Sequence, residues 1–460
     1  MDITKTNQLA SNVFEKISLK EKLGYASGDL ACNFIYQTVS SYLLFFYTDV
    51  FGITAAAAGF MFLIVRMFDA VMDPFVGTAI DRTNTKYGRF RPYILYGAIP
   101  FAVVAILCFT TPGFSAPMKL VYAYITYILL SVTYSVVNIP YAALTSAITQ
   151  DNKEIVSLTS VRMLFSNAGG IIVSFGVPLL AGIFTHMTGK TSSGWQITMS
   201  TMGILGAIIL IFCFLNTKER VQVNHSKEAK INFKDIFLQL RINRPLVIIC
   251  LFFILNFGVN SIVNSVGIYY ITYNVARPDL VKWYGLMGTL PALVLMPLMP
   301  LMNKLMGKKK LLFTALSMKA IGLIALFLIP SSMVPLIFTA RLIAALGTIT
   351  AGGFVWALIP ETIDYGEYKT GKRTSGIIYA LVGFFFKFGM AIGGIVPGLI
   401  LSKYGYVANQ VQTATALHGI LMTLTLIPAI FVIIELGAIF FYNLDEKEHK
   451  RVLNELNARM

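Results

Sequence analysis

Two aspartates and an arginine stand close together inside a long apolar stretch of this chain. Asp69 and Asp73 are four residues apart, and Arg66 precedes Asp69 by three. On a helix, side chains with this spacing lie on one face. Each charge in a bilayer costs roughly 2.5–3.5 kcal/mol on insertion scales, and leucine would pack there at lower cost. The spacing therefore predicts a site for an ion or a proton; the alternative is a buried charge network with Arg66 and Lys387 that fixes helix contacts.

The composition is that of a membrane protein. Of the 460 residues, 56% are hydrophobic and only 13% are charged, whereas soluble domains carry about 25% charged residues. The four cysteines lie in apolar runs, and neither they nor the four histidines show the spacing of metal ligands. We therefore expect no disulfide framework, no metal site and no resident cofactor.

Apolar runs of about 20 residues, enough to cross the hydrocarbon core, recur along the whole chain. They predict an all-α polytopic membrane protein with twelve transmembrane helices, placed roughly at residues 24–48, 54–80, 93–111, 119–147, 160–185, 196–215, 245–273, 281–303, 311–330, 334–360, 376–402 and 414–442. The longest interruption is rich in charge and follows the sixth run. We therefore expect four parts: an N-terminal six-helix half (1–215), a central cytosolic loop (216–244), a C-terminal six-helix half (245–443) and a cytosolic tail (444–460).

The basic residues predict how the chain is oriented. With the N-terminus inside, the inner segments hold 27 of the 37 Lys and Arg residues and the outer loops hold five, while five more lie within apolar runs. Cytoplasmic loops carry the excess of Lys and Arg. Both termini are therefore expected in the cytosol, in a plasma (inner) membrane protein. Because this charge is mainly a topology signal, we expect no binding of nucleic acid.

Several short motifs in register resemble one family of sugar carriers. Twelve helices in two halves, with a basic turn that contains Gly77, Asp81 and Arg82 after the second helix, resemble a major facilitator transporter. The more specific stretches are Tyr47-Thr48-Asp49-Val50, Arg66-x-x-Asp69-Ala70-x-x-Asp73-Pro74, Tyr87-Gly88-Arg89-Phe90-Arg91-Pro92, Asn138-Ile139-Pro140-Tyr141 and Asp364-Tyr365-Gly366-Glu367-Tyr368-Lys369. These are similar to the glycoside–pentoside–hexuronide:cation symporter family, the melibiose permease-like branch of the major facilitator superfamily.

This resemblance implies symport of a sugar or glycoside with H⁺, Na⁺ or Li⁺. The cation site of melibiose permease uses two carboxylates that match Asp69 and Asp73, and a hydroxyl that matches Ser135. Met72 stands where that permease has an asparagine, so one oxygen ligand for Na⁺ is lost, and hard cations want about six. We therefore favour H⁺ over Na⁺, with Asp69 and Asp73 as the ligands if Na⁺ is used. Lys387 matches a family position near sugar or cation and is expected in the coupling group; the alternative is a packing pair.

The resemblance also implies a sugar site. Asn33 and Asn138 stand where melibiose permease has aspartates, and amides still donate to and accept from hydroxyls. Asp29, one turn before Asn33, adds a carboxylate on the same face. The expected substrate-binding residues are Asp29, Asn33, Tyr134, Asn138, Arg162 and Trp356. Each has an ordinary alternative: closeness to the membrane surface, hydrogen bonding between helices, snorkelling of the arginine, or packing of the tryptophan.

We therefore expect a secondary active symporter that imports a disaccharide, pentoside or hexuronide by alternating access, with the sugar bound between the halves. The rival is a carrier of the same fold for a lysolipid or drug, because fold alone does not fix the substrate. An enzyme is not expected, since the chain contains neither HExxH nor GxSxG. The identity of the glycoside, the oligomeric state and the role of Glu435 stay open.

Overall fold

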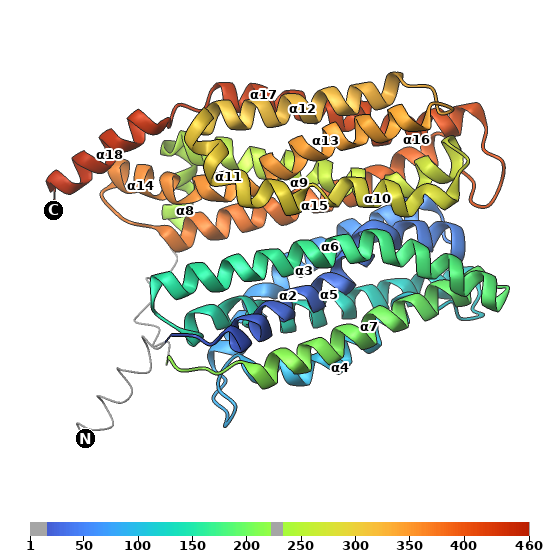
Figure 1. The fold of residues 1–460 in the computed structure, drawn as a ribbon, viewed down its shortest axis with the longest axis horizontal. Helices are drawn as coiled ribbons and strands as arrows, with labels where there is room; N and C mark the ends of the chain where they lie inside the picture. The colour runs from blue at the N-terminus through green and yellow to red at the C-terminus, as the bar shows by residue number, and fades with distance from the viewer. Residues whose placement is uncertain (1–15, 222–232, 460) are drawn as a thin grey trace. The chain divides into compact units, whose positions relative to one another are not determined.

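The structure is a computed structural model that describes residues 16–221 and 233–459 (Figure 1). Expectations for the N-terminal residues 1–15 and for the middle of the central loop, residues 222–232, lie outside the described residues. Within the described ranges the chain is helical throughout its regular structure, and the one β-type pairing there is an isolated bridge between Thr85 and Gly88.

The chain forms two compact units. Unit 1 comprises residues 1–53 and 67–226, and unit 2 comprises residues 54–66 and 227–460. The α-helices from the first half of the chain are α2 (Leu19–Phe45), α3 (Ala55–Asp81), α4 (Arg91–Cys108), α5 (Ala116–Ile148), α6 (Asn152–Thr188) and α7 (Thr191–Asn216). The first turns of α3 belong to unit 2 and the rest of α3 belongs to unit 1.

Within unit 1, α2 packs along α6 and α7, and α4 packs against α5 and α7. A glycine permits the approach of α2 to α5. A Cβ at Gly28 would lie 2.4 Å from the Cε2 atom of Tyr141, so a larger residue would push the two helices apart. Gly28 directly precedes Asp29, and this contact therefore sets the position of an expected sugar-site residue.

Unit 2 contains the remaining helices: α8 (Phe233–Ile242), α9 (Arg244–Tyr269), α10 (Val281–Thr289), α11 (Ala292–Met306), α12 (Lys308–Leu328), α13 (Val334–Phe354), α14 (Ile359–Thr370), α15 (Ser375–Lys403), α16 (Ala414–Leu424), α17 (Leu426–Phe440) and α18 (Glu446–Arg459). Helix α9 packs against α15 and α17, and α12 packs against α13 and α17. Close approach again depends on glycine: a Cβ at Gly389 would lie 2.4 Å from the carbonyl oxygen of Ile254. Small residues let membrane helices approach at backbone distance.

Three of the expected spans are interrupted helices. The run 334–360 passes from α13 through the 3₁₀ helix η4 (Val355–Leu358) into α14. The run 281–303 divides into α10 and α11 at Leu290 and Pro291, and the run 414–442 divides into α16 and α17 at Thr425. Proline has no backbone N–H and its ring clashes with the carbonyl four residues earlier. Pro291 and Pro428 therefore favour a break at these points.

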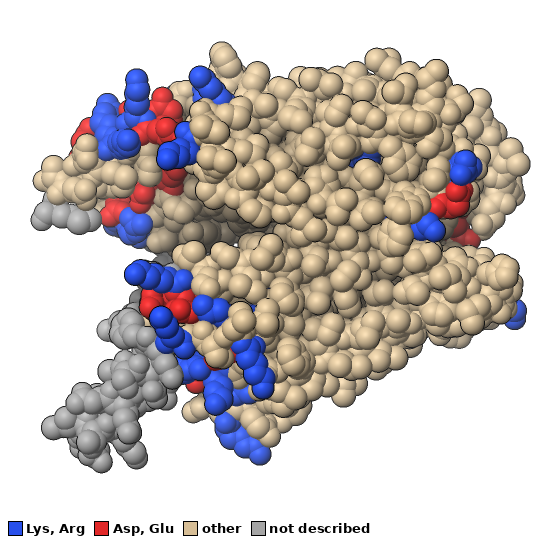
Figure 2. Space-filling view, in the orientation of Figure 1, with Lys and Arg blue, Asp and Glu red and all other residues tan. Residues whose placement is uncertain are grey.

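Eleven helices in the described residues, some of them joined pairs, are long and apolar enough to cross a membrane. The more polar α2, which is 27 residues long, completes a set of twelve. On the visible face of each unit, charged side chains gather near the helix ends, and the surface along the middle of the helices is almost entirely uncharged (Figure 2). Apolar side chains within the helices, such as Ile64, Val103 and Ile125, are exposed. The described helices therefore fit the predicted all-α membrane protein with twelve transmembrane helices.

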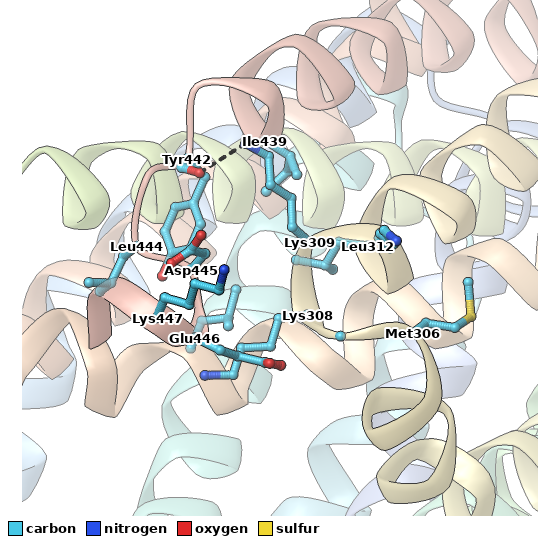
Figure 3. A pocket seen from close by; sticks show the side chains of 13 residues that line it. Met306, Lys308, Lys309, Leu312, Ile439, Tyr442, Leu444, Asp445, Glu446 and Lys447 are labelled. Carbon is cyan, nitrogen blue, oxygen red and sulfur yellow. Dashed lines mark hydrogen bonds between the residues drawn. The ribbon is translucent and has the colours of Figure 1, made fainter. Parts of the chain in front are cut away.

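A pocket of about 520 Å³ opens in unit 2, where α12 begins near the end of α17 and the start of α18 (Figure 3). Lys309 extends its side chain there, and its Nζ atom donates to the carbonyl oxygens of Phe440 (2.8 Å) and Tyr442 (3.2 Å). Cations stabilise the carbonyl end of a helix. The described side chains that line this pocket include none of the expected sugar or cation residues, so the pocket is a separate feature of the helix ends.

Candidate functional site

The two helix-α3 carboxylates meet two serine hydroxyls of α5. Ser131 Oγ donates to Asp69 Oδ1 at 2.8 Å. Ser135 Oγ lies 3.0 Å from the same oxygen and 2.9 Å from Asp73 Oδ1. Asp69 and Ser135 are buried, and Asp73 is half-buried. Asp69 and Asp73 are four residues apart on α3, and Ser131 and Ser135 are four residues apart on α5. Each pair therefore lies on one face of its helix, and the two faces bring the four side chains together.

This geometry has a chemical consequence for protons. A hydroxyl carries one proton, so Ser135 donates fully to only one carboxylate at a time. The second short oxygen–oxygen contact is then a shared hydrogen bond, which a proton on one carboxyl group would turn into a full one. Two carboxylates that share one partner also repel one another when both are ionised. A proton or a cation at this pair would reduce that repulsion.

A second polar cluster joins α2 to α6. Arg162 Nε lies 3.7 Å from Asp29 Oδ2, and Arg162 Nη1 donates to the Tyr25 hydroxyl at 3.4 Å. Asn33 Nδ2 donates to Ser166 Oγ at 3.0 Å and to the backbone carbonyl of Asp29 at 2.9 Å. The side chains of Asp29, Asn33 and Arg162 are half-buried. The structure thus brings three of the expected sugar-site residues into one cluster, in which the arginine faces a carboxylate.

Tyr134 lies on α5 next to Ser135, one turn from Asn138. Its ring stacks on the ring of Tyr36, with centroids 5.2 Å apart and planes inclined by 23°. Asn138 is half-buried on the same helix. Tyrosine rings offer an apolar face and a hydroxyl, and amides both donate and accept, so these residues have the chemistry that a sugar ring requires.

The remaining two expected residues belong to unit 2. Lys387 is half-buried on α15. Trp356 lies in the short 3₁₀ helix η4 (Val355–Leu358), is 46% exposed, and packs edge-on against Phe253 with ring centroids 4.8 Å apart. Their approach to the cation and sugar residues of unit 1 stays a prediction.

Three polar partners were not singled out from the sequence. Ser131 is four residues before Ser135, Tyr25 is four before Asp29, and Ser166 is four after Arg162. Each therefore shares a helix face with a residue that was predicted. Extending each expected site residue by one turn would have found all three.

Comparison with known proteins places the chain in a family. Residues 24–446 match the family model described as MFS/sugar transport protein. The symporter YnaJ of Bacillus subtilis (strain 168) is 62% identical over 98% of this chain and 97% of its own. The isoprimeverose transporter of Lactiplantibacillus pentosus is 38% identical, over 94% of this chain and 90% of its own, and the glucuronide carrier protein homolog of Escherichia coli (strain K12) is 34% identical, over 97% of each chain.

Solved structures agree with the fold. A bacterial homolog of the human lysosomal transporter Spinster superposes with a TM-score of 0.67 at 15% identity, covering 92% of this chain and 95% of that chain. The nucleoside transporter NupG gives a TM-score of 0.61 at 15% identity, covering 93% and 100%. The chain is a multi-pass carrier of the cell membrane, and it belongs to the glycoside–pentoside–hexuronide symporter family, a sugar-transport branch of the major facilitator superfamily.

Proposed function

We propose that this carrier imports a neutral glycoside together with one proton, by alternating access. The choice of a proton rests on the hydroxyl of Ser135, which lies 3.0 Å from the carboxylate of Asp69 and 2.9 Å from that of Asp73. A proton on one carboxyl group would give the two oxygen–oxygen contacts of Ser135 one hydrogen each. A sodium ion would want about six oxygens, and Met72 supplies none where the family's sodium site has an amide.

The preference for a neutral sugar rests on Arg162. Its guanidinium already faces Asp29, at 3.7 Å, so its charge is balanced before any substrate arrives. Asn33, Tyr134 and Asn138 provide neutral donors and acceptors. This polar set also fits a glycoside better than a lysolipid or an apolar drug, for which an apolar cavity would serve.

Loading and transport are coupled through charge. A proton on the pair Asp69 and Asp73 removes their mutual repulsion, and the proton-loaded carrier then binds sugar more tightly. By thermodynamic reciprocity, bound sugar strengthens proton binding by the same factor. The loaded carrier turns to face the cytosol and releases both. Lys387 is proposed as a further member of the coupling group, since an ammonium near the carboxylates would compete with the proton for their charge.

The substitution Asp73→Asn tests the coupling. It leaves one carboxylate beside Ser135, so we expect uphill accumulation to be lost while exchange of sugar across the membrane continues. Accumulation of radiolabelled isoprimeverose in membrane vesicles with an imposed pH gradient measures this. Wild-type accumulation by the variant would contradict the coupling role of the pair.

Two controls sharpen the test. Asp279→Asn removes a carboxylate that is paired with Arg277 in an exposed turn, and it should leave accumulation unchanged. Titration of uptake with Na⁺ at fixed pH addresses the choice of cation. Uptake that does not change with Na⁺ supports proton coupling, and stimulation by Na⁺ contradicts it.

A further inference from the structure

Unit 2 contains a buried charged pair that the transport mechanism above does not use. Glu435 of α17 has no solvent exposure, and Lys319 of α12 is 1% exposed. Helix α17 packs against α12 and α9. Lys319 Nζ donates to Asn256 Oδ1 of α9 at 2.7 Å, and Asn256 is also fully buried.

The carboxyl group of Glu435 is in an unusual position. Within the described part of the chain, neither of its oxygens has a hydrogen-bond partner. An ionised carboxylate buried without hydrogen bonds is strongly disfavoured, and such a group takes a proton instead. An ordinary ion pair of unit 2 differs from this arrangement, because in the pair of Lys308 and Glu361 the ammonium contacts the carboxylate directly.

Lys319 is the basic residue whose charge interacts electrostatically with the carboxyl group of Glu435. The helices packed against α17 also carry Arg244 at the start of α9, three lysines at the start of α12 and His418 on α16. Among the described groups, Lys319 is the one whose charge interacts with Glu435. The pair is close enough for electrostatic interaction, but it lies outside direct contact.

The polar surroundings can hold the pair in either protonation state. Asn256 Nδ2 and Asn260 Oδ1 on α9 have no hydrogen-bond partner among the described residues. Gly352 of α13 leaves space beside them, since a Cβ there would lie 3.5 Å from Asn256 Nδ2. A buried donor and a buried acceptor thus stay available next to the amide that accepts from Lys319.

We propose that Lys319 and Glu435 form a second proton-binding site, in unit 2, at which Glu435 holds the proton in the conformation described. The proton balance is simple: the ammonium of Lys319 gives up one proton, the carboxylate of Glu435 gains it, and the pair stays neutral overall. The resulting amine of Lys319 still donates to Asn256. This site is distinct in sequence and unit from Asp69 and Asp73, and the inference does not depend on their role in coupling.

Infrared spectroscopy of the purified full-length protein tests this site. A protonated Glu435 contributes a carboxylic acid C=O stretching band at neutral pH, which shifts in D₂O. Glu435→Gln should remove that band from the difference spectrum, and the protein should keep its thermal stability, because glutamine resembles the protonated acid. Glu435→Asp, in which the acid is one methylene shorter, should shift the band, and it serves if the glutamine variant does not fold.

Two further variants, Lys319→Met and a control at another carboxylate of unit 2, test whether the acid band belongs to the pair of Lys319 and Glu435. Lys319→Met removes the amine that can take the proton back and stabilise the carboxylate as an ammonium. Glu435 should therefore keep its proton to higher pH, and its band should persist on alkaline titration beyond the point at which it fades in wild type. Glu361→Gln, at a carboxylate in contact with Lys308, should leave the band intact. The proposal is overturned if no acid band responds to either Glu435 variant, or if Lys319→Met unfolds the protein while Glu435 shows no acid band, which would indicate an ordinary ion pair.

Discussion

Arg162 and Asp29 show how one ion pair bears on substrate choice. The guanidinium lies 3.7 Å from the carboxylate and 3.4 Å from the Tyr25 hydroxyl. An arginine with its charge already balanced has little to offer an anionic sugar. One relative, 34% identical, is named as a glucuronide carrier homolog, and another, 38% identical, as an isoprimeverose transporter, so relatives are named for sugars of different charge.

Removing the balancing charge should change selectivity. In Asp29→Asn the guanidinium of Arg162 keeps its place but loses its counter-charge. A hydrogen bond to a charged group is worth about 1.5–3 kcal/mol, so uptake of a glucuronide relative to isoprimeverose should rise roughly tenfold. Competition between the two labelled sugars in vesicles measures the ratio. Asp279→Asn, at a carboxylate paired with Arg277 in an exposed turn, should leave the ratio near wild type. An unchanged ratio in Asp29→Asn would contradict this role.

The polar residues of the candidate sites could be predicted from the sequence only in part. Asp69, Asp73 and Asp29 stand out because carboxylates in apolar runs are rare and expensive. Ser131, Ser166 and Tyr25 do not, because hydroxyl side chains are common in membrane helices and can bond to their own backbone. Glu435 stood out as well, but its lack of hydrogen-bond partners depends on the packing of α9, α12 and α17, which no spacing in the sequence reports.

At the scale of elements, a single glutamate organises one end of unit 1. The carboxylate of Glu219 accepts from the backbone N–H groups of Arg89 (2.8 Å), Phe90 (2.8 Å) and Arg91 (2.9 Å) at the start of α4. The first N–H groups of a helix have no partner within the helix, and negative charge there is favourable. Gly88 has a φ of +102°, and a Cβ at this position would lie 2.5 Å from Cδ of Glu219. The Tyr87–Pro92 motif is thus shaped to receive this carboxylate.

Glu219→Gln should destabilise unit 1. The amide keeps one acceptor oxygen, but its NH₂ group then faces a backbone donor, and the negative charge at the helix start is lost. An unsatisfied buried donor costs about 1–3 kcal/mol, so the midpoint of thermal unfolding in detergent should fall by several degrees. Glu455→Gln, at the exposed end of α18 near Arg451, is the control and should change the midpoint little. Equal midpoints for the two variants would show that Glu219 is not a structural clamp.

Elements were more predictable than their interruptions. Every expected span corresponds to a helix or to consecutive helices, because about 20 apolar residues suffice to mark one. The breaks at Pro291 and Thr425 were missed. Prolines are common in membrane helices, where neighbouring groups satisfy the freed carbonyls, and Pro74, Pro100 and Pro140 indeed lie inside continuous helices. Whether a proline breaks a helix therefore depends on its neighbours in the bundle.

At the scale of the whole molecule, the basic residues are distributed unevenly between the loops. The chain carries a net charge of +15, and the structure pairs part of the charge at the helix ends. Arg220 binds Glu21 through two hydrogen bonds of 2.7 and 2.8 Å, and Lys22 lies 2.7 Å from Glu154. These pairs link helix ends on the side predicted to be cytosolic, and the count of Lys and Arg predicts that orientation.

The predicted orientation can be tested directly with cysteine labelling, because the four native cysteines are free and buried and should react little. Lys86→Cys places a thiol in the exposed loop between α3 and α4, and Gln410→Cys places one in the exposed loop between α15 and α16. A membrane-impermeant maleimide added to intact cells should label Gln410→Cys and spare Lys86→Cys, and both should react after permeabilisation. The reverse pattern would show that the Lys and Arg bias does not predict the orientation of this carrier. The loop that contains Lys86 would then face the outside of the cell, and the loop that contains Gln410 would face the cytosol.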